Sequence, residues 1–393
     1  MNMALTPKAF TQDAVSTADV TQTHILDRAG LLALGPEWEE LVENALEENA
    51  YYSRQYCTAL LNHIEKRPLK AIAVRRGSNL VALWPFVSDR LHWGGLVSLN
   101  KAWTTDYTTT SIPLIDKRWV HEAVCAVLDT MAATVTGGDV WLLPNISLEG
   151  AVNSSLKAEM SKRGVPSKTF DPFERAILTK RGTFDDHMKE HVSKKRRKDL
   201  RRNRKRLDDL GEVTWTAHEN GPELDTAIDA FLKIEASGWK GDRGTALDCT
   251  DATRAFAKEA FGLTNGTSIT RADVLRLDGN PVAINLTLIT GNTGFTIKCA
   301  YDDAYKGQSV GLLLEEEMIR SVLEDDWIER LDSSAVSGHL ITSFWNDTIK
   351  IGDILIDART DAAPTRFKIL SWMETIRRAL RATAKDLVNR LRG

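Results

Sequence analysis

The second half of the chain contains three consecutive stretches whose hydrophobic and polar residues are typical of strands. They cover residues 272–277, 281–289 and 295–301, and the links are Asp278-Gly279-Asn280 and Gly291-Asn292. Both links are sequences that favour tight turns between antiparallel strands. The pattern therefore predicts an antiparallel meander of three strands.

A polar loop and a helix follow the third of these strands. The loop covers residues 302–308. The apolar residues after Ser309 are Leu312, Leu313, Met318, Ile319, Val322 and Leu323, and the later ones recur with helical spacing. Ser309 can cap this helix, because its hydroxyl can accept a hydrogen bond from an unpaired backbone N–H. Residues 315–317 are glutamates, and the helix dipole favours acid near a helix start.

A strand, a small-residue loop and a helix start together form a generic site for an anion. The free N–H groups and the positive end of the helix converge above the loop. Lys306 adds a cation, and Gly307 lets the backbone approach a ligand closely. On spacing alone, the loop fits an anion site and an ordinary strand–loop–helix junction equally well.

The remaining pattern predicts two α/β units. In the first half we expect helices at 37–47, 53–65, 119–135 and 148–163, and strands at 69–74, 80–87, 96–99, 112–115, 140–143 and 174–178. Around the meander and its helix we expect strands at 213–216, 328–331 and 349–355, and helices at 224–237, 252–263 and 339–345. The first half is a looser copy of the second without the phosphate-type loop, which indicates a duplicated fold without a sequence repeat.

These elements divide the chain into two mixed, mostly antiparallel lobes and three further segments. Residues 1–29 are expected to be a disordered or loosely attached lead-in. The lobes are expected at 30–182 and 212–362, with a basic connecting helix at 183–211 and a cationic amphipathic helix at 363–393. The length of 393 residues exceeds one ordinary domain, so each lobe can bury a core of its own.

Composition excludes several classes of protein. The hydrophobic and charged fractions, 42% and 27%, are those of a soluble globular protein, and no apolar run is long enough to span a bilayer. The first 23 residues lack the charged and then apolar pattern of a secretory signal. Four scattered cysteines follow no metal or disulfide spacing, so we expect no metal site and a reducing, cytoplasmic compartment.

The most conspicuous charge run lies between the two units. Residues 194–206 contain ten Lys or Arg and one acid, a local charge of +9 in a chain of formal net charge −3. Three interpretations stay open: a surface for nucleic acid, a solvated connecting helix, or a surface for anionic lipid or the phosphates of an acyl carrier. The connecting helix would bury its apolar positions, which are His187, Met188, Val192, Leu200, Leu207 and Leu210.

The last segment has the pattern of an amphipathic helix. Between residues 366 and 392, eight basic residues and two acids give a charge of +6, and one stripe contains Ile369, Met373, Ile376, Leu380, Leu387 and Leu391. A cationic helix of this kind can lie on an anionic membrane surface. It can equally pack on the body of its own protein.

The loop and its surroundings resemble a known family. Lys306-Gly307-Gln308-Ser309-Val310-Gly311 matches the pyrophosphate loop of GCN5-related N-acetyltransferases (GNAT), which reads Arg/Gln-x-x-Gly-x-Gly/Ala, with Lys at the first position and Ser for the first Gly. Residues 230–323 resemble the BioF2-like, cellulose-biosynthesis-associated members of this superfamily, which have the doubled, Fem-like arrangement. The matching residues are Glu235 to Gly241, Gly244 to Ala246, Asp278 to Ala283, Lys298 to Asp302, and Ser309 to Gly311.

The resemblance implies that an amine attacks an acyl thioester and forms an amide. Such a reaction needs a base for the ammonium and donors for the developing oxyanion. After Asp332 the chain departs from the family's glycine-tyrosine-lysine sequence, so no family base can be carried over. Among titratable groups near the strand ends, His339 is the candidate base, since imidazole titrates near neutral pH. Asp332 could orient His339 or bind the amine. A locally bonded histidine at a helix start is the alternative for His339.

Further residues are candidates for substrate contacts. The donor loop consists of Lys306, Gly307, Gln308, Ser309, Val310 and Gly311, while Trp239, Lys240, Tyr301 and Asp302 would line the acceptor or pantetheine side. In the first lobe, the polar–aromatic stretch of residues 103–107 has the pattern of an exposed loop. Its Trp103, Asp106 and Tyr107 could contact the acceptor, or the loop could be a plug.

The sequence therefore predicts an N-acyltransferase of two GNAT-like lobes with acyl-CoA, or an acyl carrier protein thioester, as co-substrate and no permanently bound cofactor. The acceptor would be a primary amine of a membrane lipid, such as a long-chain base, or of an envelope saccharide. The cationic segments favour peripheral attachment at the cytoplasmic face of the membrane. The alternatives are a Fem-type transferase that uses aminoacyl-tRNA, and a non-catalytic scaffold of an exopolysaccharide system.

Overall fold

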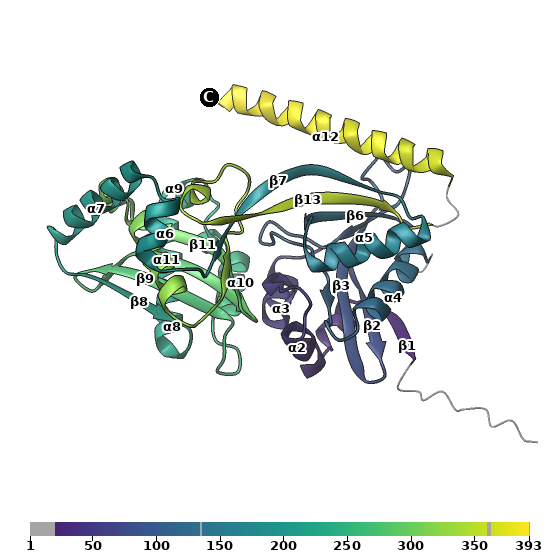
Figure 1. Cartoon of the computed structure of the whole chain (residues 1–393), viewed down its shortest axis with the longest axis horizontal. Coiled ribbons are helices and arrows are strands. Elements are labelled where there is room, and N and C mark those ends of the chain that lie inside the picture. Colours follow the sequence, from purple (N-terminus) through teal and green to yellow (C-terminus); the bar gives the residue numbers. More distant parts are fainter. Residues whose placement is uncertain (1–19, 134–135, 360–362, 393) are drawn as a thin grey trace, which may run out of the picture.

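The computed structural model describes residues 20–133, 136–359 and 363–392, with side chains up to Ala384. In this part of the chain thirteen strands form one mixed sheet, in the order β1-β2-β3-β4-β6-β13-β7-β12-β11-β10-β9-β8, and β5 pairs with β3. Helices flank the sheet, and a long helix lies along its outside at the C-terminus (Figure 1). The predicted mixed α/β class with a C-terminal helix is confirmed.

The elements of the first lobe lie where the hydrophobic pattern predicts them, with shifted ends. The strands are β2 (Leu69–Arg76), β3 (Asn79–Asp89), β4 (Leu99–Ala102), β5 (Leu114–Ile115), β6 (Val140–Ser147) and β7 (Ser167–Thr179). The helices are α2 (Pro36–Glu43), the single turn η2 (Ala50–Tyr52), α3 (Arg54–His63), α4 (Val120–Ala132) and α5 (Ala151–Arg163).

The second lobe contains the predicted meander and its helix. Its strands are β8 (Val213–His218), β9 (Thr270–Leu277), β10 (Asn280–Thr290), β11 (Thr293–Tyr301), β12 (Arg330–Asp332) and β13 (Asp347–Asp357). Its helices are α8 (Gly221–Ser237), α9 (Trp239–Asp242), η4 (Leu247–Cys249), α10 (Asp251–Phe261), η5 (Asp303–Gln308), α11 (Val310–Glu324) and η6 (Leu340–Ser343). Asp278 and Gly279 have positive φ of 48° and 77°, which the turn between β9 and β10 requires.

Two long strands join the lobes into one sheet. β13, which is late in the chain, lies between β6 and β7 of the first lobe and pairs with both in antiparallel register. The far end of β7 pairs in turn with β12 of the second lobe, through Leu178 opposite Leu331. The strand that ends the second lobe in sequence is therefore part of the first lobe's sheet (Figure 1).

The lobes also share a hydrophobic core on one face of the sheet. α3 packs against α10, and the rings of Tyr56 and Phe256 meet edge to face with centroids 5.6 Å apart. The Gln55 side chain donates to the carbonyl of Gly262 at 2.8 Å across the same contact. On the other face, a separate core joins α11 to α6 (Phe184–His191) and α7 (Lys194–Asp208).

Three expectations about the segments outside the lobes need correction. Residues 21–29 are not a loose lead-in: β1 (Thr21–Asp27) pairs with β2, and α1 (Arg28–Leu32) begins directly after it, while residues 1–19 lie outside the described residues. Residues 183–211 form two helices, α6 and α7, that separate at Val192 and Ser193. Leu210 is 52% exposed, whereas the other five predicted apolar positions of this segment are buried.

The C-terminal segment is one helix, α12 (Pro364–Arg392). None of the described helices combines the length and the apolar character that a membrane span needs.

Candidate functional site

One edge of β11 is open toward the end of the strand. β11 pairs with β12 only through residues 293–295, and the two strands separate after the Phe295–Asp332 pair. At this point the Thr296 hydroxyl donates to the carbonyl of Ser333 at 2.9 Å. Further along, the Lys240 ammonium donates to the Cys299 carbonyl at 3.2 Å, but no described strand pairs with residues 296–301 on this side. We call these residues the β11 edge.

The β11 edge leads into the predicted anion loop. Ser309 lies directly before α11 with φ 52° and ψ 47°, the left-handed conformation that glycine adopts most easily. The pyrophosphate-loop motif has Gly at this position. Ser309 therefore adopts the left-handed backbone conformation that a glycine would adopt here. The predicted capping by the Ser309 hydroxyl is wrong, since its side chain makes no capping hydrogen bond.

The loop is open to a ligand. Lys306 and Gly307 are exposed, and Ser309 is partly exposed. The N–H groups of Val310 and Gly311 occupy the first turn of α11, before the intrahelical bonds begin. A Cβ atom on Gly311 would lie 3.3 Å from the Tyr301 ring, so glycine allows the loop to close against the end of β11.

A strongly cationic helix lies beside this loop. α7 packs against both η5 and α11, with Leu200, Asn203 and Leu207 buried. The Arg204 guanidinium pairs with Glu317 of α11. The outer face of α7 is a set of exposed cations: Lys194, Lys195, Lys198, Arg201, Arg202, Lys205 and Arg206. The helix is thus packed on the protein through one face and presents positive charge next to the loop through the other.

A buried carboxylate connects α8 to the β11 edge. Glu235 accepts from the Leu247 N–H at 2.8 Å and from the Lys240 ammonium at 2.9 Å, and the Lys298 ammonium lies 3.4 Å away. Although burial opposes its ionisation, the two ammonium groups and the Leu247 N–H hold the pKa of Glu235 below its usual range. Burial, opposed by the attraction of Glu235, lowers the pKa of the Lys298 ammonium.

The structure brings three of the predicted substrate residues together at the end of the β11 edge. Trp239, Lys240 and Tyr301 line one small cavity of about 30 Å³, and the Trp239 ring is 47% exposed. Asp302 lies beside them, and its carboxylate accepts from the Ala304 N–H at 2.9 Å, so it caps η5.

The stretch 103–107 of the first lobe is not the exposed loop that its pattern indicates. Trp103 is fully buried, stacks on Tyr52 and donates to the Glu65 carboxylate at 2.6 Å. Asp106 is exposed. Tyr107 is partly buried between the lobes, with its ring 5.8 Å from the Lys298 ammonium. Only Tyr107 of these predicted contacts reaches the β11 edge directly.

The point at which β11 and β12 separate is closed by groups from both lobes. The Tyr51 hydroxyl shares a hydrogen bond of 2.7 Å with Ser334 and accepts another of 2.7 Å from Thr109. The Arg175 guanidinium donates to the carbonyls of Thr109 and Ala335 at 2.8 and 3.2 Å. Burial raises the pKa of Tyr51 to about 12, so its hydroxyl remains a proton donor at neutral pH.

Asp332 belongs to this cluster, whereas His339 does not. The buried Asp332 carboxylate lies 3.7 Å from Arg175 and accepts from the Ser334 N–H at 2.7 Å. His339 is exposed, and its Nδ1 accepts from the Ile341 N–H at 3.3 Å, so it caps η6. Among the described residues, no hydrogen bond or ion pair joins Asp332 to His339.

His339 lines a separate open cavity of about 600 Å³ with Arg196 and Glu174. The hydrogen bond from the Ile341 N–H agrees with the alternative interpretation, in which His339 is a locally bonded histidine at a helix start.

A further titratable group lies on α11, on the side of the sheet opposite α8. Glu315 is partly exposed and accepts from the Trp345 indole N–H at 2.7 Å. Burial raises the pKa of this carboxyl from 4.5 to about 7, although the hydrogen bond from Trp345 opposes the shift. A carboxylate that titrates near neutral pH is suited to accept a proton from an ammonium.

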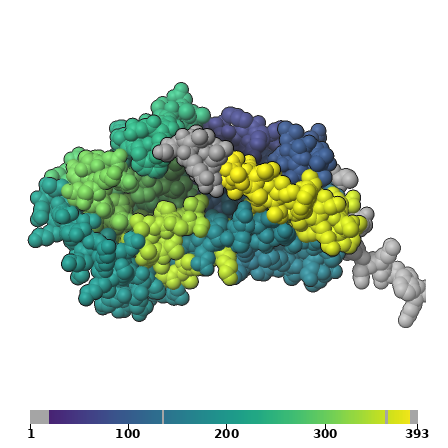
Figure 2. All heavy atoms as spheres, turned by 90° about the horizontal axis from the view of Figure 1, so that it is seen from above, coloured from purple at the N-terminus to yellow at the C-terminus, as the bar shows by residue number. Residues whose placement is uncertain are grey.

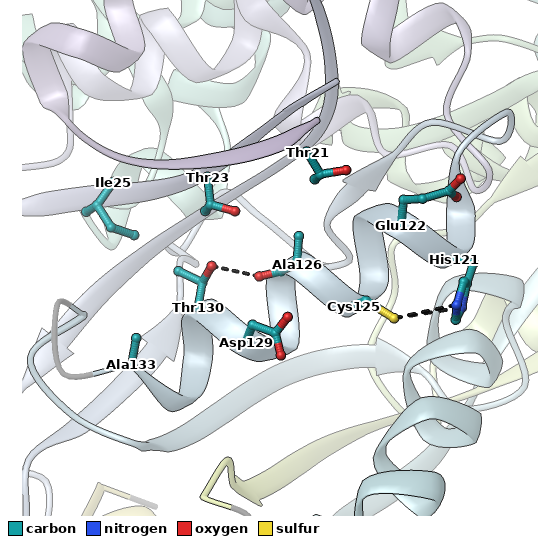
Figure 3. A pocket seen from close by; sticks show the side chains of 10 residues that line it. All are labelled: Thr21, Thr23, Ile25, His121, Glu122, Cys125, Ala126, Asp129, Thr130 and Ala133. Atoms are coloured by element: carbon teal, nitrogen blue, oxygen red, sulfur yellow. Dashed lines mark hydrogen bonds between the residues drawn. The ribbon is translucent and has the colours of Figure 1, made fainter. Parts of the chain in front are cut away.

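Among the described residues, one group of side chains could hold a metal ion. His121 and Cys125 lie one helical turn apart on α4 (Figure 3), and their ligand atoms lie within 4.8 Å of one another and of a Glu159 oxygen. The Glu159 carboxylate already accepts from Arg163 at 2.8 Å and Lys162 at 3.2 Å. This cluster borders a cavity of about 560 Å³ between β1 and α4, in the first lobe and away from the β11 edge.

Most of the residues at the separation point had no signal in the sequence. Tyr51 and Ser334 are 283 positions apart, and Arg175 lies inside an ordinary strand pattern. Glu235 and Lys298 belong to segments that carry the family resemblance, and that resemblance is the signal that could have singled them out. For Glu315, the sequence indicates only an acid near the start of a helix.

The class of protein follows from the fold and the site. A doubled, mixed α/β fold with an open strand edge that runs into a helix-start loop is the fold that the chain shares with FemX, and its second lobe contains an acetyltransferase domain of the GNAT type. Residues 194–336, which contain the β11 edge and the loop, match the family model described as an acetyltransferase (GNAT) domain. Among curated proteins, none matches the sequence.

Solved structures of similar fold extend over nearly the whole chain. FemX superposes with a TM-score of 0.54 at 12% identity, covering 81% of this chain and 95% of its own. The C-terminal domain of a protein assigned as a lysylphosphatidylglycerol synthetase from Agrobacterium fabrum gives 0.53 at 12%, covering 88% and 96%. L-PGS from Bacillus licheniformis gives 0.51 at 13%, also covering 88% and 96%. At these identities the likeness shows the fold.

Proposed function

We propose that the protein is an N-acyltransferase that moves an acyl group from acyl-CoA, or from an acyl carrier protein, to a primary amine of a membrane lipid such as a long-chain base. The observation that carries the proposal is the open β11 edge, which leads from the cluster at Tyr51 to the loop of residues 306–311. An envelope saccharide with a primary amine is the other acceptor of the same chemistry.

The donor fits the loop and the edge by its functional groups. A pyrophosphate above the loop would accept from the N–H groups of Val310 and Gly311 at the positive end of α11. The exposed cations of α7, next to the loop, would attract the phosphates of CoA or the acidic surface of a carrier protein. The amide groups of a pantetheine arm can pair with the β11 edge as an added strand would.

With the donor in this position, its thioester would lie near the point where β11 and β12 separate. The amine nitrogen attacks the carbonyl carbon, the carbonyl oxygen becomes an oxyanion, and the carbon–sulfur bond then breaks with release of the thiol. The Tyr51 hydroxyl is protonated and buried, and it would donate to that oxyanion in place of its hydrogen bond with Ser334. Arg175 orients this region through the carbonyls of Thr109 and Ala335.

Two groups compete for the role of proton acceptor. Glu315 is favoured by its raised pKa and by its position on the helix that follows the loop, although, among the described residues, no hydrogen bond or ion pair joins it to the cluster at Tyr51. His339 is the candidate from the sequence and lies outside the cluster at Tyr51, so it would have to act through a bound acceptor or a water. Asp332, which is buried beside Arg175, would act by positioning Ser334.

A lipid acceptor is supported by the role assigned to one protein of similar fold. The proteins from Agrobacterium fabrum and Bacillus licheniformis share this fold, and the first is assigned to the synthesis of lysylphosphatidylglycerol, which is a lipid. The acceptor would enter from the side of the first lobe, where Tyr107 approaches Lys298.

Turnover of acyl-CoA by the purified protein tests the proposal. Thiol release should require an amine acceptor, with long-chain bases compared against amino sugars. Gly311→Glu places a carboxylate where the phosphates are expected and should abolish donor binding by Coulomb repulsion. Gly35→Glu is the matched control, because a Cβ atom at Gly35 meets nothing within 4 Å in the first lobe.

The same assay separates the alternatives. Activity that depends on aminoacyl-tRNA and disappears with ribonuclease would show a Fem-type transferase and overturn the thioester donor. Equal CoA affinity of wild type and Gly311→Glu in calorimetry would remove the loop from the mechanism. A protein that releases no thiol with any amine, yet binds envelope saccharide, would be a scaffold.

A further inference from the structure

The C-terminal helix α12 packs on the protein through its charged face. Glu374 is fully buried there, lies 2.9 Å from His92 Nε2, and accepts from the Trp93 indole N–H at 3.2 Å. Arg378 bonds to Glu374 at 2.7 Å and to Asp353 of β13 at 2.8 Å. Leu370, Phe367 and Met373 of α12 pack on the apolar cluster beside these polar groups. The helix is therefore held both by ion pairs and hydrogen bonds and by an apolar contact.

Most of the apolar stripe that the sequence indicates faces away from this contact. Its members Ile369, Ile376 and Leu380 are 58%, 37% and 66% exposed, and Trp372, which the predicted stripe did not include, lies among them with 64%. Of the predicted stripe, Met373 alone among the described members is partly buried against the body. α12 lies on the outside of the molecule, where Figure 2 shows it as a ridge over the surface. The stripe thus has no cover within the described residues.

Packing on the protein body covers only part of the apolar surface of α12. An amphipathic helix that is stabilised by its own protein alone turns its apolar stripe inward. Here the stripe stays outside, and the loop beside α12 exposes two further large residues, Leu91 at 79% and Leu96 at 77%, while its His92 and Trp93 hold the helix. Several large exposed apolar side chains of this kind mark a surface that meets another apolar phase.

The charges around the stripe indicate which phase this is. Lys368 and Arg381 are exposed on α12. The cavity of about 700 Å³ that Arg381 lines contains the cations Lys101, Arg377 and Arg378 as well as the carboxylates of Asp89, Asp171 and Asp353. The sequence continues the stripe with Leu387 and Leu391, and adds Lys385, Arg390 and Arg392 against one acid, Asp386. A second copy of the same helix would bring these like charges together, whereas an anionic bilayer complements them.

We propose that α12 and the loop of residues 90–97 form a membrane-docking face, which inserts the stripe into the interface of an anionic bilayer. The cations would contact lipid phosphates, and the ion pairs of Glu374 and Arg378 would hold the helix in this orientation. That the bilayer also supplies the amine acceptor rests on the proposed function, but the docking itself does not.

Co-sedimentation of the full chain with phosphatidylcholine vesicles that contain phosphatidylglycerol tests the proposal, in the absence of any donor or acceptor. The wild type should bind these vesicles, and binding should weaken with salt and on phosphatidylcholine alone. The double variant Ile376→Asp/Leu380→Asp should bind at least roughly tenfold more weakly, because it removes two apolar side chains from the interface. Its melting temperature should stay unchanged, since both side chains are exposed.

Leu210→Asp supplies the matched control, because Leu210 is also exposed but follows the cationic helix α7. This variant should bind as the wild type does. Loss of binding in Leu210→Asp with binding retained in the α12 variant would move the lipid contact to α7 and overturn the proposal. The proposal would also be overturned if the wild type did not bind anionic vesicles.

A second copy of the chain, bound to the stripe in place of a membrane, would give a different result. In that case the wild type would be a dimer in sedimentation equilibrium, Ile376→Asp/Leu380→Asp would be a monomer, and neither would bind vesicles, which also overturns the proposal. Turnover on a water-soluble short-chain amine should be equal in wild type and variant. Failure of turnover in both, with vesicle binding intact, would contradict the proposed reaction and leave the docking face standing.

Discussion

Replacing Glu315 by glutamine keeps the size of the side chain and removes its titration. In the native protein the carboxyl accepts from the Trp345 indole at 2.7 Å, and burial raises its pKa from 4.5 to about 7. A raised carboxyl pKa means that the protonated, neutral form is favoured in the folded state. The stabilisation that this provides is fully present below pH 4.5 and is lost as the pH rises through about 7.

The size of the effect follows from the shift. One pKa unit corresponds to about 1.4 kcal/mol. The rise from 4.5 to about 7 therefore makes the charged carboxylate of the native state costlier by up to about 3 kcal/mol above pH 7. Since glutamine stays neutral, Glu315→Gln should be more stable than the wild type at pH 8.5 by up to this amount. At pH 4.5 and below, the two proteins should be equally stable.

Urea unfolding at the two pH values measures this difference, and acyl transfer measured over the same range tests the role in catalysis. If Glu315 is the proton acceptor, the wild-type rate should rise with pH through about 7, and the variant should be about 10²–10⁴-fold slower without that dependence. Glu324→Gln, on the exposed end of the same helix, is the control and should change neither measurement. Equal stabilities of wild type and Glu315→Gln at pH 8.5 would refute the reasoning about burial, and an unchanged rate would refute the role as base.

Three further substitutions test the rest of the site. Tyr51→Phe removes the hydroxyl but keeps the ring contacts, and steady-state kinetics should show a turnover roughly 10²-fold lower with little change in donor affinity; a wild-type rate would exclude Tyr51 as oxyanion donor. Glu235→Ala leaves the Lys298 and Lys240 ammonium groups without their carboxylate and should destabilise the protein by about 3–5 kcal/mol in chemical denaturation, and a loss below 1 kcal/mol would contradict the burial argument. His339→Ala should retain turnover if Glu315 is the base, whereas a loss of about 10²–10⁴-fold would assign that role to His339.

Local pattern was sufficient for the elements around the loop. The meander of β9, β10 and β11 follows from strand-like runs separated by tight-turn sequences, which are properties of neighbouring residues. The loop and α11 follow from small residues before a helical spacing. Ser309 shows the limit of this reasoning. Its backbone has the left-handed conformation that the loop needs before α11, but its side chain does not form the expected cap.

Residues far apart in sequence decided the site. Tyr51, Thr109 and Ser334 meet because β13 returns to the first lobe's sheet and β7 extends into the second, and no periodicity within one segment encodes such a pairing. Trp103 reads as part of an exposed polar loop, but Glu65 supplies a buried acceptor for its indole N–H. A hydrogen-bond partner so far away in sequence cannot be found from the pattern of neighbouring residues.

The sequence by itself determined the two lobes' elements, the GNAT-type loop and the existence of a cationic amphipathic helix at the C-terminus, because each depends on spacing and charge within a short stretch. Only the tertiary structure decided which side of that helix is outside. Glu374 bonds to His92, Trp93 and two arginines, Leu370 packs beside them, and these buried contacts leave Ile369 and Leu380 toward solvent. A helical wheel gives the stripe but not its direction, since the direction depends on the groups that the rest of the fold places against the opposite face.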